Sequence, residues 1–151
     1  MAKYMNIDDF NKKFGGILDL KFTKEPVLIS PNMYNTTGAP GAKIKSVKFD
    51  AYVNLEDEHG EYDQRKPTKA ELDSVVLKQP SLKMSGRANV DVEHKAPNKK
   101  YFTARDLIAA IRETERQTRS QTVWFGGIDT HHVYFEGLHI EGGAYHIFWG
   151  S

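Results

Sequence analysis

Four arginines on one predicted helix are the residues of this sequence best suited to bind an anion. At about 100° per residue, a helix over residues 104–119 brings four guanidinium groups within about 60° of arc: Arg105, Arg112, Arg116 and Arg119. Guanidinium groups bind phosphate and carboxylate oxygens bidentately, so this stripe predicts a site for a nucleotide, a nucleic acid or an acidic protein surface. The alternative is a solvated helix face, neutralised by acidic neighbours and by the helix dipole.

A pair of histidines near the end of the sequence is the second candidate. Gly142-Gly143 is a two-residue hairpin signal, and a turn there places His139 directly opposite His146 on paired strands. Two such imidazoles could bind a phosphate, share a metal ion or simply be solvated. A zinc ion normally needs a third protein ligand, for which His132 and Glu141 are the candidates. Because no compact metal motif is present, we expect neither a metal nor a cofactor.

The segment 91–95 is the third candidate. Asp91, Glu93 and Lys95 resemble the catalytic set of the PD-(D/E)xK nucleases. The resemblance implies an Mg²⁺ ion held by carboxylates and a lysine that positions the attacking water. That family also needs an acidic residue on a preceding strand, and the sequence around Asp73 favours a helix there. A Mg²⁺-dependent nuclease is therefore kept as an alternative, and we expect a non-enzymatic protein.

The amino-acid composition excludes several other classes of protein. The 151 residues include 21 Lys and Arg against 20 Asp and Glu. The resulting net charge of +1 excludes a polybasic protein. The absence of cysteine excludes disulfides and thiol catalysis, and is typical of a reducing compartment such as the cytoplasm. No apolar run approaches the ~18 residues of a membrane span, and the first residues lack a signal-peptide pattern, so we expect no membrane association.

Residues that cap helices precede three predicted helices. Asn6 begins the first, over residues 7–14, which Gly15 and Gly16 end. Capping boxes begin the other two: Thr68 with Glu71, and Thr103 with Asp106. The second helix is predicted to carry three apolar residues: Leu72, Val75 and Val76.

Alternation of apolar and polar residues predicts the strands. The longest alternating run extends from Val47 to Leu55, and Ile44 breaks it, which predicts a bulge near Ser46. The order of elements lacks the strand–helix rhythm of a parallel α/β fold. We therefore predict a single α+β domain over residues 1–151, in which an antiparallel sheet packs against the 104–119 helix, accompanied by two short helices.

Further expectations concern burial. Residues 123–125 are predicted to form a buried strand, and residues 31–42 a long loop. The exposed Phe148 on the non-core face of the hairpin favours a homo-oligomer. Seven residues are expected in the core: Leu107, Ile108, Ile111, Trp124, Ile140, Ile147 and Trp149.

The last third of the chain resembles small accessory proteins of bacteriophages and prophages. The resemblance rests on the Thr-capped helix start at 103–108, the segment Val123-Trp124-Phe125-Gly126-Gly127, and the glycine-turned hairpin near the end. It implies a compact non-enzymatic protein of the anti-defence type, which binds a host protein or a small nucleotide. A structural or assembly component is the remaining alternative.

Overall fold

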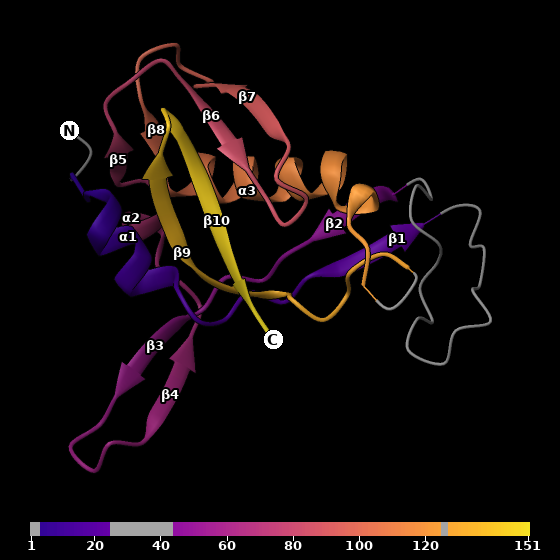
Figure 1. Ribbon diagram of the computed structural model, residues 1–151. Helices are drawn as coiled ribbons and strands as arrows, with labels where there is room; N and C mark the ends of the chain where they lie inside the picture. Colours follow the sequence, from indigo (N-terminus) through magenta and orange to yellow (C-terminus); the bar gives the residue numbers. More distant parts are fainter. Residues whose placement is uncertain (1–3, 25–43, 125–126) are drawn as a thin grey trace.

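The computed structural model describes residues 4–24, 44–124 and 127–151, and the fold is α+β as predicted (Figure 1). Its helices are α1 (Ile7–Phe14), α2 (Lys69–Leu72) and α3 (Ala104–Thr118), and the 3₁₀ turn η1 (Arg119–Gln121) continues α3. The predicted loop over 31–42 and the residue Phe125 lie outside the described residues.

The three helices begin where their capping residues predict. The Asn6 side chain accepts a hydrogen bond from the backbone of Asp9 at the start of α1. Full capping boxes begin α2 and α3, at Thr68 and Thr103 respectively. The prediction that α2 carries the valines after Leu72 is wrong. Val75 and Val76 belong to strand β5 (Val75–Leu77), where both are buried, as suits β-branched residues in a sheet.

The main sheet contains four strands in the order β7 (Asp91–Lys95), β6 (Ser81–Ser85), β10 (Ala144–Gly150) and β9 (Tyr134–Glu141). The pairs β6–β7 and β9–β10 are antiparallel hairpins, whereas β10 lies parallel to β6. The predicted antiparallel sheet is therefore confirmed as a mainly antiparallel one, with β6–β10 as its parallel pair. The chain between β6 and β10 passes through α3, and such a crossover can return a strand in the same direction.

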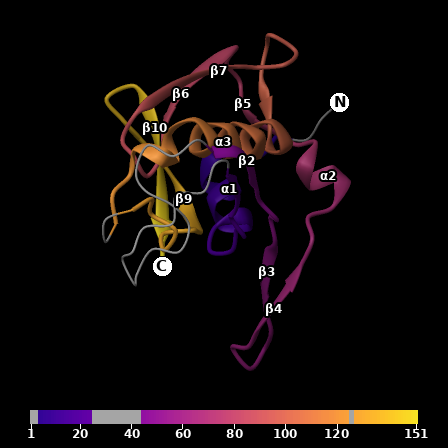
Figure 2. The ribbon, with the colours of Figure 1, turned by 90° about the vertical axis from the view of Figure 1, so that its right-hand side faces the viewer.

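Three two-stranded sheets complete the fold: β1 (Lys21–Lys24) with β2 (Ile44–Lys48), β3 (Val53–Glu56) with β4 (Tyr62–Arg65), and β5 with β8 (Phe102–Thr103). In β2 the register steps from Ser46 to Ile44 across consecutive residues of β1, so the predicted bulge is confirmed. The single strand predicted from Val47 to Leu55 is wrong, because it divides into β2 and β3. Both views show that the β3–β4 hairpin projects from the rest of the molecule (Figures 1 and 2).

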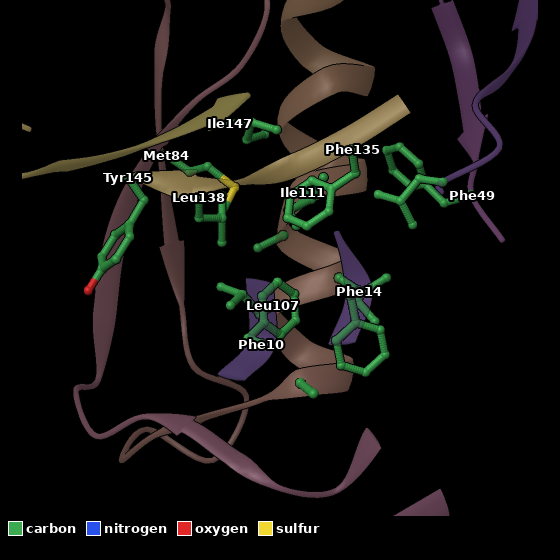
Figure 3. Packing of buried hydrophobic residues seen from close by; sticks show 14 of the residues in the cluster. Phe10, Phe14, Phe49, Met84, Leu107, Ile111, Phe135, Leu138, Tyr145 and Ile147 are labelled. Carbon is green, nitrogen blue, oxygen red and sulfur yellow. The ribbon is translucent and has the colours of Figure 1, made fainter. Parts of the chain in front are cut away.

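The core lies between α1, α3 and the inner face of the main sheet. Figure 3 shows Phe10, Leu107 and Ile111 close together, and all three are 0% exposed. Five of the seven predicted core residues are buried: Leu107, Ile108, Ile111, Ile147 and Trp149. Trp124 is half-buried. Ile140 is 59% exposed, because it lies at the turn end of β9, whereas Phe135 and Leu138 farther along the same strand are buried.

The buried strand predicted for residues 123–125 is wrong. Val123 is 67% exposed, and Trp124 forms an isolated bridge with Gly127 in which each backbone N–H bonds the other residue's carbonyl. The chain therefore reverses direction here instead of extending as a strand. This turn leads into the loop that carries the candidate site.

Candidate functional site

The site begins in the loop after α3, where Asp129 is a buried carboxylate. Its Oδ1 accepts the backbone N–H groups of His131 at 2.9 Å and His132 at 3.2 Å, and its Oδ2 lies 2.7 Å from both Arg87 Nε and His132 Nδ1. The side chain is 1% exposed. Burial acts to raise the pKa of the Asp129 carboxyl, but these hydrogen bonds outweigh it and the pKa is lowered. The carboxylate is ionised and fixed.

Asp129 orients the ring of His132. A carboxylate oxygen only accepts hydrogen bonds, so this contact assigns the proton to His132 Nδ1 and leaves a lone pair on Nε2. Trp124 packs against the ring in a T-shaped arrangement, with centroids 4.7 Å apart. Within the part of the chain that the structure describes, no hydrogen bond reaches His132 Nε2. One ring nitrogen therefore stays available to a ligand.

A buried ion pair at the end of α3 holds the 129–132 loop in place. Glu115 Oε2 accepts Arg119 Nε at 2.7 Å, and both side chains are 0% exposed. Arg119 Nη1 also donates to the carbonyl oxygens of Asp129 at 3.0 Å and His132 at 2.9 Å. The guanidinium thus connects the helix to both ends of the segment 129–132.

The other oxygen of Glu115 holds the β6–β7 turn at the site. Glu115 Oε1 accepts the backbone N–H of Arg87 at 3.0 Å and Trp149 Nε1 at 2.6 Å. A Cβ atom at Gly86 would overlap this carboxylate, so the close approach of the β6–β7 turn requires glycine there. Glu115 and Arg119 together position Arg87 and His132, which meet at Asp129 Oδ2 and line one cavity.

That cavity has a volume of about 480 Å³ and is bordered by the β6–β7 turn, the 129–132 loop and the β9–β10 hairpin. It is referred to below as the histidine pocket, defined by six of its lining residues: Arg87, His132, His139, Glu141, His146 and Phe148. The predicted pairing of His139 with His146 is confirmed by the register, and Gly142 and Gly143 in the turn both have positive φ.

The polar groups of the pocket have few partners. His146 Nε2 lies 3.3 Å from the carbonyl of Glu141, and the ring of His139 packs 5.7 Å from that of Phe148. Arg87 uses only Nε of its guanidinium, and no described residue bonds its terminal nitrogens. Ser85 does not line the cavity; it lies beside His146 in the sheet register, and its buried hydroxyl has no hydrogen-bond partner among the described residues.

The predicted stripe of four arginines is divided by the structure. The expectation that Arg119 shares an exposed surface with the others is wrong, because the end of α3 is covered by the 129–132 loop and Trp149. Arg116 bonds both oxygens of Glu113, with Nε at 2.8 Å, and these bonds lower the pKa of the Glu113 carboxyl to about 2. Arg105 lies 3.3 Å from Asp73.

Arg105 and Arg112 border a second hollow, of about 360 Å³, between α3 and the chain around Phe49. This arginine groove is defined by five of its residues: Phe49, Lys66, Leu72, Arg105 and Arg112. Arg112 lies over the Phe49 ring, 5.7 Å from its centroid. The groove has a cationic rim and an apolar floor, and Asp50 is the acidic residue among those that line it.

The nuclease residues do not form the site that the resemblance implies. Asp91, Glu93 and Lys95 share the exposed face of β7. On the preceding strand β6, the residue opposite Glu93 is Lys83, so a cation occupies the place where a second acid is needed. Over residues 4–24, 44–124 and 127–151, no three His, Asp or Glu side chains gather in a way that could hold a metal ion.

No family model, no curated protein and no solved structure matches this chain. The resemblance to phage accessory proteins and the expectation of a homo-oligomer therefore stay predictions. In the described part of the chain, no helix combines the length and apolar character needed to span a bilayer.

Sequence reasoning missed Arg87 and Asp129 and considered His132 only as a third zinc ligand. One signal was available, because Asp129-Thr130-His131-His132 has the spacing in which an aspartate accepts hydrogen bonds from the backbone two and three residues later. No signal pointed to Arg87, which reaches Asp129 across 42 residues of sequence.

Proposed function

We propose that this protein binds a phosphate-bearing ligand, a nucleotide or a nucleic-acid segment, in the histidine pocket. The observation that carries the proposal is the convergence of the Arg87 guanidinium and three imidazoles on one cavity of about 480 Å³. This volume lies within the roughly 300–1,000 Å³ of small-molecule sites. Guanidinium forks and imidazoles are the groups that bind phosphate oxygens, and the terminal nitrogens of Arg87 are open to them.

The formal charges around the pocket are mixed. Asp129 offsets the charge of Arg87, and Glu141 adds a negative charge at the border. The terminal nitrogens of Arg87 and the three imidazoles are therefore the groups that a phosphate would meet.

The test is calorimetric titration of the protein with AMP, ATP and inorganic phosphate. Replacing the hairpin pair, His139→Gln with His146→Gln, is expected to weaken binding about 10-fold or more. The matched control is His59→Gln, at the exposed tip of the β3–β4 hairpin. Equal affinity of the double variant and the control would reject the pocket as the site, and thermal melts of both check the fold.

The arginine groove supports a second candidate function, the binding of an acidic segment of another protein. Lys66, Arg105 and Arg112 surround an apolar floor, which suits a peptide that carries carboxylates beside an apolar side chain. Replacing Arg105 and Arg112 with glutamate reverses the charge of the rim. Labelled peptides with alternating Glu and Leu, compared with their Gln and Leu counterparts, measure whether the rim selects negative charge.

A further inference from the structure

The Asp129–His132 pair has a property that binding alone does not require. A phosphate can be bound by any cation, whereas a buried carboxylate behind an imidazole stabilises the ring after it has gained a proton. Asp129 is 1% exposed and lies 2.7 Å from His132 Nδ1, so His132 Nε2 is arranged to take up a proton inside the pocket. This is the geometry of a general base.

The hairpin histidines supply the complementary group. His139 and His146 lie directly opposite each other on β9 and β10, and both line the same cavity as His132. A carbonyl oxygen only accepts hydrogen bonds, so the Nε2 atom of His146 that faces the Glu141 carbonyl carries a proton. When this ring is also protonated on Nδ1, the resulting imidazolium can give that second proton to a departing oxygen, as a general acid does.

The lining of the pocket also limits the source of the nucleophile. No serine, threonine or lysine is among the described residues that line the cavity, and the chain has no cysteine. Among its described lining residues the pocket therefore offers no hydroxyl, amine or thiol nucleophile of the chain, and the substrate or water can supply the attacking oxygen. RNA provides its own nucleophile, since each 2′-hydroxyl is held next to the phosphorus that it attacks, which gives it a high effective concentration.

We propose that the histidine pocket cleaves RNA by transesterification, an inference that rests on the proposed binding of phosphate there. His132 Nε2 takes the proton of a 2′-hydroxyl, and the 2′-oxygen forms a bond to phosphorus. The bond from phosphorus to the 5′-oxygen breaks, and the departing oxygen receives a proton from the His139–His146 pair. The products are a 2′,3′-cyclic phosphate and a 5′-hydroxyl, so no water is consumed.

The remaining pocket residues have roles in the same step. The terminal nitrogens of Arg87 stabilise the negative charge that develops on the phosphate oxygens. Phe148 is 51% exposed, and its ring offers a stacking surface for a nucleobase. Asp129 is a positioning residue, since it acts on the substrate only through His132.

The experiment uses a labelled DNA oligonucleotide that contains one ribonucleotide, in the presence of EDTA. Wild-type protein is expected to cut only after the ribonucleotide and to leave a 2′,3′-cyclic phosphate, identified by mass spectrometry. An oligonucleotide with a 2′-O-methyl group at that position should stay intact. His132→Gln should slow cleavage about 100-fold or more, whereas His59→Gln, purified in the same way, should not change it.

Two results would overturn this inference. The first is an inactive wild-type protein that still binds inorganic phosphate, which would leave the proposed binding function standing. The second is equal cleavage by wild type and His132→Gln, which would identify a contaminating ribonuclease. If His132→Gln does not fold, His146→Gln serves instead, because it leaves the contacts of Asp129 intact. Asp129→Asn should shift the acidic limb of the pH–rate profile if its carboxylate tunes His132.

Discussion

Arginines on the same side of α3 and of the turn η1 that continues it are used differently. Within α3, Arg105 is about half exposed and Arg112 lies over Phe49 at the border of the arginine groove. In η1, Arg119 is 0% exposed, bonded to Glu115 and to two carbonyl oxygens of the 129–132 loop. The difference teaches that helical spacing predicts only the side of the helix on which the arginines lie. The chain packed over each arginine decides whether it is exposed, paired or buried.

The same comparison separates the two candidate sites. The arginine groove displays its cations directly at the surface. The histidine pocket uses its most buried charges, Glu115 and Arg119, to hold Arg87 and His132 in place. Charge at the groove therefore lies where a partner could reach it, although Arg105 already contacts Asp73. Charge beneath the pocket instead positions the groups that would meet a ligand.

The largest effect on stability is expected at Arg119. Arg119→Gln leaves Glu115 as a buried charge without its ion-pair partner and should destabilise the fold by about 3–5 kcal/mol. Arg112→Gln, within α3, is the matched control. Urea denaturation of both variants measures the difference in the free energy of unfolding. Equal values would mean that the exposed and the buried arginine do not differ as described.

The next comparison is between the buried Ile111 and the exposed Arg112, which are neighbours on α3. Ile111→Ala removes a side chain that is 0% exposed and should cost about 2–5 kcal/mol, through lost burial and the cavity that remains. The neighbouring Arg112, one residue along, faces the groove. A change below half a kcal/mol for Ile111→Ala, measured by the same denaturation, would show that the helix face is assigned wrongly.

The pH dependence of stability is expected to depend on His94, which lies on β7 and contacts α3 at Thr114. Burial lowers the pKa of His94, against the opposing charge of Glu113, and His94 Nε2 lies 2.7 Å from Thr114 Oγ1. The unfolded chain therefore takes up the proton at higher pH than the folded one. The stabilising contribution is complete above the unfolded pKa of about 6.5 and is lost as the pH falls toward the folded value.

His94→Gln should consequently flatten the decline of stability between pH 7.5 and pH 5, as measured by thermal melts. His59→Gln, at an exposed hairpin tip, should leave that decline unchanged. A variant at residue 94 with the wild-type slope would assign the decline to other groups.

The smallest effect on stability is expected at the exposed arginines. Arg112→Gln and Arg116→Gln should each change the free energy of unfolding by about 0.5 kcal/mol or less, because surface substitutions rarely cost more. Neither should alter phosphate binding in the histidine pocket. A loss of phosphate affinity in Arg112→Gln would mean that the groove, and not the pocket, takes the ligand.

Local patterns predicted much of the fold correctly. Capping residues located the starts of the helices, since an N-cap side chain acts only on the next three residues. The two glycines of the last hairpin determined its register and so the pairing of His139 with His146. Patterns failed where burial depended on distant chain, as for Ile140 at the turn end of β9 and for Val123 before a reversal.

The candidate site could be predicted only in part, for the same reason. His139 and His146 are seven residues apart and their contact follows from one turn. Arg87 meets Asp129 across 42 residues, and Trp149 meets Glu115 across 34. No periodicity carries information over such separations.

The sequence by itself determined the class of fold, the helix starts, the hairpin and the supply of arginines and histidines, because each depends on interactions between residues a few positions apart. Only the tertiary structure decided which arginine is buried, which is paired and which borders a groove. It also brought Arg87, Asp129 and His132 together with the hairpin histidines. The physical reason is that burial and the pairing of charges are set by all the chain around a residue, and for this site that chain comes from the β6–β7 turn, the end of α3 and the final hairpin.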